Sequence, residues 1–510
     1  MIHVTATGKI ATPYHEGVAT LFPYAQRFSF QGRDMLALRH RTEETIMLRR
    51  FGIDAPAPVL TQYDWGSRVP FEVQRKTIAM LTTNNRAYCL NGLGSGKTFC
   101  ALSAFNFLRQ DRIVNKMLVV CPMSTMRSTW AKEIFEQFPN LTCSVLFGAK
   151  PKRLKLLAEN ADIYIINHDG FATIREEIAA RADIDLLCID ELAIYRNGQA
   201  TRTKVMKQYA ATKDWVWGMT GSPVPNGPQA AWGQCSIVTP HTVPKYFKHF
   251  RDRVQYKVGQ FQWEDKDDAL ETVYKVMQPA VRYSLDDVTE LPELVERYQD
   301  VPMGPKQTEL YAAMKAQAMA LTDSGEITAA NAGAVLSKLL QISMGYVYTS
   351  DGRAVTLDGN ARMDAVIDTV MASANKVIIF APYKHVLEGI STRLTAEGVD
   401  FAVVSGDTPE RQRAELFAKF QKTNRLRVLA AHPQCMAHGL TLTAADTIIW
   451  FGPVTSLETF EQANGRIRRI GQKHKQLVLK LQSTAAERKM YRLLEKRQRI
   501  QNNLLGLFSE

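Results

Sequence analysis

The chain has 510 residues, too many for one ordinary hydrophobic core, and this length predicts two or three domains. Apolar residues make up 45% of the chain and charged residues 22%, a balance typical of globular proteins. The excess of 63 Lys and Arg over 51 Asp and Glu favours a polyanionic partner, although a basic cytosolic enzyme without such a partner would show the same excess.

The seven cysteines are scattered, mostly in apolar runs, and form no Cys-x-x-Cys pair. This pattern predicts reduced, buried thiols and argues against disulfides or a zinc ribbon. The sequence has no apolar run of about 18 residues, and its start lacks the basic and apolar regions of a secretory signal. We therefore expect a cytoplasmic protein without a membrane segment.

Residues 1–65 are expected to form a small N-terminal accessory domain. Residues 27–30 and 35–38 predict a hairpin that turns at Gln31-Gly32, and residues 42–51 predict a basic helix closed by a glycine. The proline-containing stretch 55–60 follows as an expected linker. The basic residues of this region either contact a phosphate backbone or lie on a solvated face, and the sequence favours the solvated face. These residues are Arg39, His40, Arg41, Arg49 and Arg50.

The segment 91–98, Asn-Gly-Leu-Gly-Ser-Gly-Lys-Thr, predicts a nucleotide site. It lies between an apolar run at 87–90 and a helical-looking run at 99–108, which is the strand, loop and helix order of a phosphate cradle. Glycines allow successive N–H groups to turn toward phosphate oxygens, and the helix N-terminus adds partial positive charge. Asn91 stands where the strict phosphate-loop pattern has glycine.

Lys97 is expected to neutralise the β- and γ-phosphates, and Thr98 to place its hydroxyl on Mg²⁺. Gln74 lies on a predicted helix just before the loop strand, where its side-chain amide can read both hydrogen-bonding edges of adenine. The loop residues expected to contact the nucleotide are Gly94, Ser95, Gly96, Lys97 and Thr98.

Further apolar runs end in polar residues, which is typical of parallel strands whose carboxyl ends face a ligand. The run at 117–121 is followed by Pro-Met-Ser-Thr, that at 163–166 by Asn-His, and Met219 by Thr-Gly-Ser. The hydroxyl residues at these strand ends are Ser124, Thr220 and Ser222.

The run 185–191 predicts an apolar strand that ends in two carboxylates, Asp190 and Glu191. Asp190 can hold Mg²⁺, while Glu191 can orient and deprotonate an attacking water. A strand ending in a solvated acidic turn would have the same composition, but the upstream phosphate loop favours the catalytic interpretation.

The second half repeats the α/β pattern without a phosphate loop of its own. Strands are predicted at 376–381 and 428–431, and residues 403–407 end another strand in Ser-Gly-Asp, which precedes a helix at 409–421. The expected fold class is therefore α/β throughout.

The order of these segments resembles that of superfamily-two helicases. Gln74, the glycine loop, the Cys-Pro-Met-Ser-Thr strand end, Asp-Glu-Leu-Ala at 190–193 and Thr-Gly-Ser-Pro-Val-Pro-Asn at 220–226 are similar to the Q motif and motifs I, Ia, II and III. Residues 437–446 and 462–472 resemble motifs V and VI. Ala193 stands where the family usually has histidine.

Within that superfamily, residues 291–311 and the segment beginning at Leu339 resemble the Swi/Snf-related DNA translocases, and the resemblance covers about residues 68–500. It implies two RecA-like, doubly wound parallel-sheet lobes, a small N-terminal α+β domain and helical insertions. The implied divisions are 1–65 accessory domain, 66–235 ATP-binding lobe, 236–335 helical insertion or linker, 336–482 second lobe and 483–510 C-terminal brace helix.

The resemblance also implies site residues in the second half. Arg466 and Arg469, spaced i and i+3, are expected on one helical face and would act as arginine fingers on the γ-phosphate; a basic surface helix is the alternative for this run. Gly439 would belong to the nucleotide site, and Thr441 and Thr443 would offer hydroxyls to a nucleic-acid backbone. Ser124, Thr220 and Ser222 would do so, or couple the two sites, in the first lobe.

The function implied is ATP-dependent translocation on DNA, with ATP and Mg²⁺ required. Double-stranded DNA is favoured, with branched or single-stranded DNA also compatible, and the identity of any protein partner is left open by the sequence. Two alternatives stay open: a strand-separating or annealing helicase acting on DNA or RNA, and an ATP-gated nucleic-acid clamp without turnover. The compact chain favours the cytoplasm of a bacterial or phage-infected cell.

Overall fold

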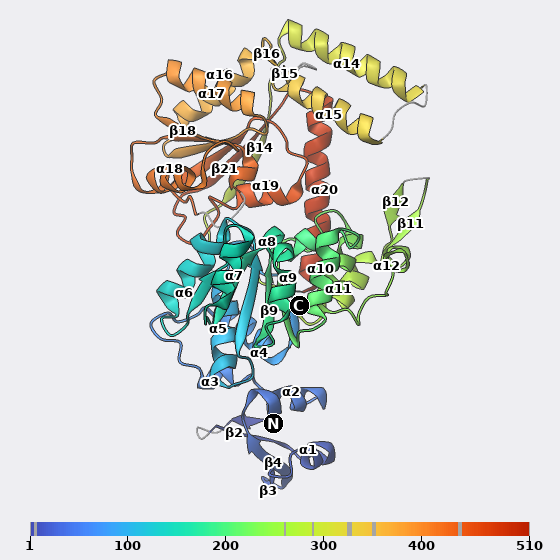
Figure 1. Ribbon diagram of the computed structural model, residues 1–510. Helices are drawn as coiled ribbons and strands as arrows, with labels where there is room; N and C mark the ends of the chain where they lie inside the picture. The colour runs from blue at the N-terminus through green and yellow to red at the C-terminus, as the bar shows by residue number, and fades with distance from the viewer. Residues whose placement is uncertain are drawn as a thin grey trace. The chain divides into compact units, whose positions relative to one another are not determined.

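The computed structural model describes residues 2–4, 8–259, 262–287, 290–323, 329–348, 353–436 and 441–508, with backbone only at 318–323 and 329–332. The chain divides into two compact units. Unit 1 comprises Met1–Val288 and Gln501–Glu510, and unit 2 comprises Thr289–Ile500. Figure 1 gives the labels of the elements in chain order.

Unit 1 begins with a four-stranded antiparallel sheet in the order β1-β2-β4-β3, accompanied by two helices (Figure 1). The predicted hairpin is confirmed, with its turn at Gln31 (φ 49°) and Gly32 (φ 73°), and the predicted helix is confirmed as α2. The elements are β1 (His3–Val4), β2 (Lys9–Pro13), α1 (Glu16–Leu21), β3 (Gln26–Phe30), β4 (Arg33–Arg39) and α2 (Thr42–Arg50).

Two of the basic residues assigned to a solvated face or a phosphate contact are structural instead. His40 is 1% exposed and its Nε2 lies 2.8 Å from the Pro56 carbonyl oxygen. Arg49 donates from Nε to the Ala55 carbonyl and from Nη1 to Thr83 Oγ1, at 2.9 and 2.7 Å. These bonds fix the stretch 55–60, whose alanines are buried, against the neighbouring elements.

The main sheet of unit 1 has seven parallel strands. In order across the sheet they are β13 (Ala280–Val281), β5 (Arg86–Cys89), β10 (Trp215–Met219), β9 (Ile184–Asp190), β6 (Lys116–Cys121), β8 (Ile163–Asn167) and β7 (Cys143–Val145). The helices of this part are α3 (Val59–Gln62), α4 (Glu72–Thr83), α5 (Lys97–Gln110), α6 (Lys132–Gln137), α7 (Lys150–Ala158), α8 (His168–Thr173), α9 (Arg175–Ala179), α10 (Thr201–Ala210), α11 (Ala231–Val238), α12 (Phe247–Val254) and α13 (Ala269–Val276), and β11 (Gln255–Lys257) pairs with β12 (Trp263–Asp265).

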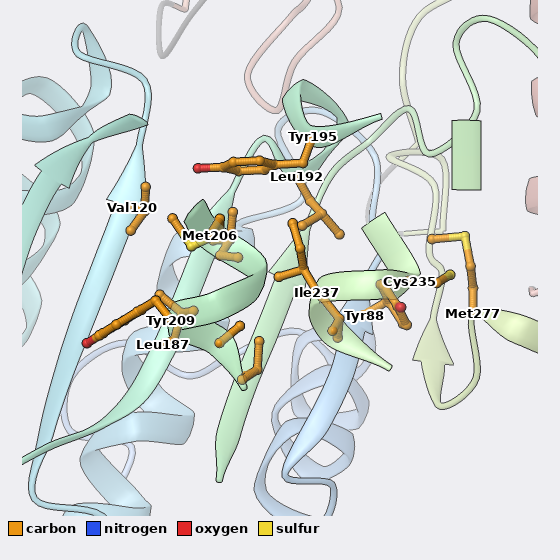
Figure 2. Packing of buried hydrophobic residues seen from close by; sticks show 14 of the residues in the cluster. Tyr88, Val120, Leu187, Leu192, Tyr195, Met206, Tyr209, Cys235, Ile237 and Met277 are labelled. Atoms are coloured by element: carbon orange, nitrogen blue, oxygen red, sulfur yellow. The ribbon is translucent and has the colours of Figure 1, made fainter. Parts of the chain in front are cut away.

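Both faces of this sheet are buried, so its strands are apolar at nearly every position. In β6, Leu118 and Val120 belong to one core, and Met117 and Val119 to the other, as the two-residue period of a strand requires. Figure 2 shows the first core, where Val120 and Leu187 of the strands lie among side chains such as Met206.

The strand register brings the predicted site segments to one edge of the sheet. Met219, the last residue of β10, pairs with Cys89 at the end of β5 and with Asp190 at the end of β9. Because neighbouring strands lie about 4.8 Å apart, the glycine loop and the two carboxylates begin roughly 10 Å from each other.

Unit 2 holds a second parallel sheet, of six strands. In order they are β14 (Leu294–Asp300), β21 (Gln476–Gln482), β20 (Ala445–Trp450), β17 (Lys376–Phe380), β19 (Val428–Ala431) and β18 (Phe401–Val404). Its helices are α14 (Pro305–Asp323), α15 (Ala329–Ser343), α16 (Asn360–Ala372), α17 (Lys384–Ala396), α18 (Glu410–Lys422), α19 (Leu457–Asn464) and α20 (Ala485–Leu507), and β15 (Tyr346–Tyr348) pairs with β16 (Ala354–Thr356).

The α/β fold class with two parallel-sheet lobes is confirmed, and the strands and the helix predicted in the second half are present. All seven cysteines are free thiols, five of them buried. Within the described ranges, none of the helices combines the length and the apolar character needed to cross a bilayer.

A buried ion pair ties α16 to α20 in unit 2. Arg362 donates from Nη1 and Nη2 to the two carboxylate oxygens of Glu487, at 2.8 and 2.9 Å, and the two side chains are 2% and 0% exposed. The Ser483 N–H also donates to Glu487, and the Arg362 guanidinium donates to the Phe451 carbonyl. Both carboxylate oxygens of Glu487 and both terminal nitrogens of Arg362 are therefore hydrogen-bonded.

Glu487→Gln is expected to lower the free energy of unfolding of unit 2 by about 3–5 kcal/mol, because it leaves the Arg362 cation buried without its counter-charge. Chemical denaturation followed by far-UV circular dichroism measures this change. Glu415→Gln, at a solvent-exposed pair with Arg411, is the matched control and is expected to leave the midpoint unchanged. A Glu487→Gln midpoint equal to that of the control would contradict the prediction.

Candidate functional site

The glycine loop leaves the carboxyl end of β5 and enters α5 at Lys97. Gly94 and Gly96 have φ angles of 80° and 83°, a left-handed conformation that glycine adopts at low cost. A Cβ on Gly96 would also lie 2.5 Å from Gln74 Nε2, so a larger residue would displace the Gln74 side chain. The loop therefore has the backbone geometry that its sequence predicts.

Asn91, the departure from the strict loop pattern, has a structural role. It is 1% exposed, and its Nδ2 donates to Thr77 Oγ1 of α4 at 2.8 Å. Its Oδ1 accepts from the Tyr283 N–H, also at 2.8 Å, just beyond β13. The Asn91 side-chain amide thus joins α4 to the segment after β13. A glycine at this position could form neither of these two side-chain bonds.

The Lys97 ammonium lies inside the loop. Its Nζ donates to the carbonyl oxygens of Asn91 and Gly92, at 2.9 and 3.1 Å. Ser95 Oγ also donates to the Gly92 carbonyl, at 2.8 Å, and Thr98 lies half-buried in the first turn of α5. The cation and the hydroxyl of the predicted Lys-Thr pair are therefore both at the helix N-terminus.

Gln74 is 3% exposed and supports the loop. Its Oε1 accepts from the Phe71 N–H at 3.1 Å, which caps α4, and its Nε2 donates to the Ser95 carbonyl at 3.0 Å. Adenine recognition by this amide stays a prediction. The contacts described here connect α4 to the loop.

Asp190 ends β9 and is 9% exposed. The Trp130 indole Nε1 donates to Asp190 Oδ2 at 3.0 Å, and Trp130 itself is completely buried in a π-helical segment, Met126–Ala131. Burial raises the pKa of the Asp190 carboxyl, whereas the Trp130 hydrogen bond and the Lys97 charge oppose that shift. The indole therefore both orients the carboxylate and favours its ionised form.

Glu191 has a left-handed backbone, with φ 55° and ψ 53°. A non-glycine residue in this region is strained by about 1–3 kcal/mol, and such strain is concentrated at functional sites. The Glu191 carbonyl accepts from the Ile194 N–H at 3.1 Å, which begins the tight helical turn Leu192–Tyr195. Ala193 is buried in that turn.

The hydroxyl residues predicted in unit 1 are divided between buried and exposed positions. Thr220 is completely buried; its N–H donates to the Cys89 carbonyl at 3.1 Å, and its Oγ1 accepts from the Ser222 N–H at 3.1 Å. Gln501 Nε2 donates to Ser222 Oγ at 3.1 Å, and Ser124 is exposed just before the π-helical segment. Thr220 thus joins the end of β10 to the start of the glycine loop.

The placement of Arg466 and Arg469 on one helical face is wrong. Helix α19 ends at Asn464, and both arginines lie in the turns that follow. The Arg466 carbonyl accepts from the Leu442 N–H at 3.0 Å, and Arg469 Nε donates to the Gly465 carbonyl at 3.1 Å. These bonds replace the i to i+4 ladder that a helix would need here.

The two arginines nevertheless lie beside the predicted motif V segment. Arg469 Nη1 is 3.5 Å from Thr441 Oγ1, and Arg466 is 1% exposed. Burial lowers the pKa of Arg469 to about 10, which leaves a cation at neutral pH. Thr443 Oγ1 accepts from Gln421 Nε2 at 3.0 Å, and Gly439 lies outside the described residues.

Helix α20 carries a basic stripe opposite its buried face. The stripe residues recur at three- and four-residue intervals and are all exposed, and they are Lys489, Arg492, Lys496 and Arg499. The buried residues Met490, Tyr491 and Leu494 lie on the other side of the helix. A solvated helix face and a polyanion-binding surface both have this pattern.

Sequence reasoning missed two residues that hold the site. Trp130 is 60 residues from Asp190, and Arg282, whose Nη1 donates to the Leu90 carbonyl at 2.9 Å, is 192 residues from it. In the sequence, Trp130 appears only as an isolated tryptophan after the Pro-Met-Ser-Thr strand end, and Arg282 as a residue after the short apolar run that forms β13. Neither pattern indicates which residue the side chain contacts.

Two family models match the chain. The model of the SNF2-related domain matches residues 80–345, which is more than half of the 510 residues, and that of the helicase conserved C-terminal domain matches residues 361–471. The first model includes the glycine loop and the two carboxylates, and the second includes Arg466 and Arg469.

Curated relatives are similar over most of this chain. "Putative protein p41" of Acyrthosiphon pisum secondary endosymbiont phage 1 is 24% identical over 78% of the chain and 88% of its own length. The "ISWI chromatin-remodeling complex ATPase ISW1" of Saccharomyces cerevisiae is 22% identical over 82% of the chain, which spans only 38% of that protein. The "SWI/SNF-related matrix-associated actin-dependent regulator of chromatin subfamily A-like protein 1" of Xenopus laevis is 22% identical over 80% of the chain and 41% of its length.

Among solved structures, the "Sulfolobus solfataricus SWI2/SNF2 ATPase core in complex with dsDNA" aligns with a TM-score of 0.42 and 21% identity, over 87% of this chain and 94% of that one. The family match itself rests on the two domain models and on their order along the chain. The chain belongs to the SNF2-related family of helicase-like ATPases.

Proposed function

We propose that the chain is an ATP-driven translocase on double-stranded DNA, which hydrolyses ATP to ADP and phosphate as it moves. The observation that carries the proposal is the meeting of the glycine loop, with Lys97, and the two carboxylates, Asp190 and Glu191, at one edge of the unit 1 sheet. Family membership supports the ATPase part of the proposal.

The residues at this edge fit a nucleoside triphosphate. The left-handed glycines leave the loop backbone open to phosphate oxygens, and the N-terminus of the 14-residue helix α5 contributes partial positive charge. Lys97 would exchange its bonds to the Asn91 and Gly92 carbonyls for bonds to β- and γ-phosphate oxygens. We propose Gly94, Ser95, Gly96 and Thr98 as its partners in binding, and Gln74 as the residue that connects this binding to α4.

Mg²⁺ also fits the chemistry of the site, because Asp190 and Thr98 offer the oxygen ligands that this ion prefers. When bound, Mg²⁺ would supply charge neutralisation at the phosphates. Asp190 would hold the ion with the orientation that Trp130 imposes. Glu191, fixed by its left-handed backbone, would orient the attacking water and accept its proton.

Arg466 and Arg469 are proposed as the cations that stabilise the transition-state charge. Lys97 and Glu191 belong to unit 1 and the two arginines to unit 2, so the proposal makes hydrolysis depend on residues of both units. A cycle in which each turnover alternates the grip of the units on a backbone would produce movement.

Duplex DNA is the proposed track for three reasons. The net charge is +12, the basic stripe of α20 is exposed along one helix face, and relatives carry names of chromatin-remodelling ATPases. Contacts to phosphates would dominate binding, so affinity is expected to be tolerant of sequence and to fall steeply with salt. Ser124, Thr441 and Thr443 are proposed as hydroxyl contacts to the backbone, and Thr220 and Ser222 as the connection to the loop.

Lys97→Ala and Glu191→Gln are each expected to reduce duplex-stimulated ATP hydrolysis at least about a hundredfold, because one removes the phosphate cation and the other the base. Steady-state phosphate release with and without duplex DNA measures the effect. Glu72→Gln, an exposed carboxylate on α4 paired with Lys76, serves as the control and should keep wild-type turnover. Wild-type turnover in Lys97→Ala or Glu191→Gln would refute the assignment of the site.

Trp130→Phe is expected to raise the Mg²⁺ concentration for half-maximal ATPase activity about 10- to 100-fold, since the carboxylate loses the donor that orients it. A Mg²⁺ titration of ATPase activity at saturating ATP measures this shift. Trp217→Phe is the matched control, because this fully buried tryptophan lies on β10 and its indole donates to the Asn84 carbonyl, at 3.3 Å, instead of to a site carboxylate. Equal Mg²⁺ requirements in the two variants would show that the Trp130 bond has no positioning role.

A further inference from the structure

The two faces of the N-terminal sheet differ in composition. One carries a small hydrophobic core, and the other carries two exposed phenylalanines beside the buried Met35. Successive side chains of a strand point to opposite faces, and Ile10, Leu36 and Leu38 pack on one face against α1 and α2. By the same alternation, Phe28 and Phe30 of the edge strand β3 point to the other face. Their side chains are 37% and 44% exposed, unusually high values for two phenylalanines on one strand.

On the face of the two phenylalanines, the charged strand residues have one sign. The strand register places Arg33 opposite Phe30, and Arg39 opposite Lys9, all on the side of the two phenylalanines. In the four strands, every residue of which is described, the acid is Asp34. It lies on the opposite face of the sheet, where it pairs with Arg27. Cations therefore flank the two rings without a strand carboxylate among them.

Arg39 extends this surface toward the start of β3. Its guanidinium lies 5.0 Å from the centre of the Tyr24 ring. The Tyr24 hydroxyl donates to Glu44, the nearby acid on α2, which is 7% exposed. That carboxylate is therefore bonded to the tyrosine and shielded from solvent.

The spacing of the rings selects the kind of nucleic acid. Phe28 and Phe30 are two residues apart on one strand, so their rings are about 7 Å apart, roughly twice the 3.4 Å rise per nucleotide of a duplex strand. Bases in a duplex cover one another's faces, whereas unpaired bases offer their faces to aromatic side chains. Rings at this spacing match bases that are separated from each other.

We propose that this aromatic face, made of Lys9, Phe28, Phe30, Arg33 and Arg39, binds single-stranded nucleic acid. Two unpaired bases stack on the two phenyl rings, and the phosphates lie against the flanking cations. A protein partner or a second copy of the chain would favour a continuous apolar patch, which two rings among three cations do not form. The inference stands independently of the proposed motor function.

Fluorescence anisotropy with the full chain, in the absence of ATP, tests the proposal. The probes are labelled oligothymidine, labelled oligouridine and a labelled duplex. Phe28→Ala/Phe30→Ala is expected to weaken single-strand binding at least about tenfold, while duplex binding changes less than about twofold. The tighter of the two single-strand probes identifies DNA or RNA as the ligand. Unchanged single-strand binding in this variant would overturn the proposal.

Three further variants separate stacking and charge from other effects. Phe28→Leu/Phe30→Leu keeps apolar side chains but removes the aromatic rings. It is expected to weaken single-strand binding as much as the alanine variant does. Single-strand binding equal to that of the wild type would overturn the stacking proposal and indicate a protein-docking surface instead. Arg33→Ala should weaken binding, whereas Arg27→Ala, an exposed arginine on the opposite face of the same hairpin, should not. Equal effects of the two arginine variants would contradict the assignment of the face.

Photocrosslinking of the wild-type chain keeps the test valid if a variant fails to fold. Oligonucleotides that carry 5-iodouracil are expected to crosslink to peptides containing Phe28 or Phe30, as identified by mass spectrometry. Crosslinks confined to residues outside the N-terminal sheet would overturn the proposal, whatever the outcome of the ATPase measurements.

Discussion

The site depends first on how the end of β5 is held. A phosphate loop works only if its N–H groups converge, and this chain fixes them from both sides: β10 pairs with β5 on one side, and β13 on the other. Asn91 and Arg282 add side-chain bonds across the same strand end. The loop is therefore held in place by segments that are far apart in sequence.

We propose that the same edge of the sheet connects DNA binding with ATP hydrolysis. Asp190 is oriented by an indole on the π-helical segment that follows Ser124, and Thr220 is bonded to the residue before the loop. A displacement of either hydroxyl-bearing segment would reach Asp190 or the loop through one or two hydrogen bonds. Through these hydrogen bonds, nucleic-acid binding and ATP hydrolysis would influence each other in the proposed mechanism. All of the bonded residues belong to unit 1.

Local sequence patterns correctly predicted the elements that adjacent residues determine. They did not predict the elements and bonds that depend on residues far away in the chain. The strand, loop and helix around Lys97 follow from apolar runs and glycines that are adjacent in the chain. The spacing of Arg466 and Arg469 predicts one helical face, and this prediction is wrong. Gly465 weakens a helix here by about 1 kcal/mol. The Leu442 N–H donates to the Arg466 carbonyl and Gln472 Nε2 to the Ile467 carbonyl, so these carbonyls bond outside a helix. β13, β14 and the Trp130 bond have partners 60 or more residues away, which no spacing rule reveals.

The central claim is that ATP turnover at this site moves the chain along duplex DNA. Displacement of a third strand from a DNA triplex measures such movement directly, and displacement of one strand from a duplex, run in parallel, measures unwinding. The account predicts ATP-dependent release of the third strand, abolished in Lys97→Ala, with the duplex left intact. Release of a duplex strand without triplex displacement, or no ATP-dependent release in either assay, would contradict it.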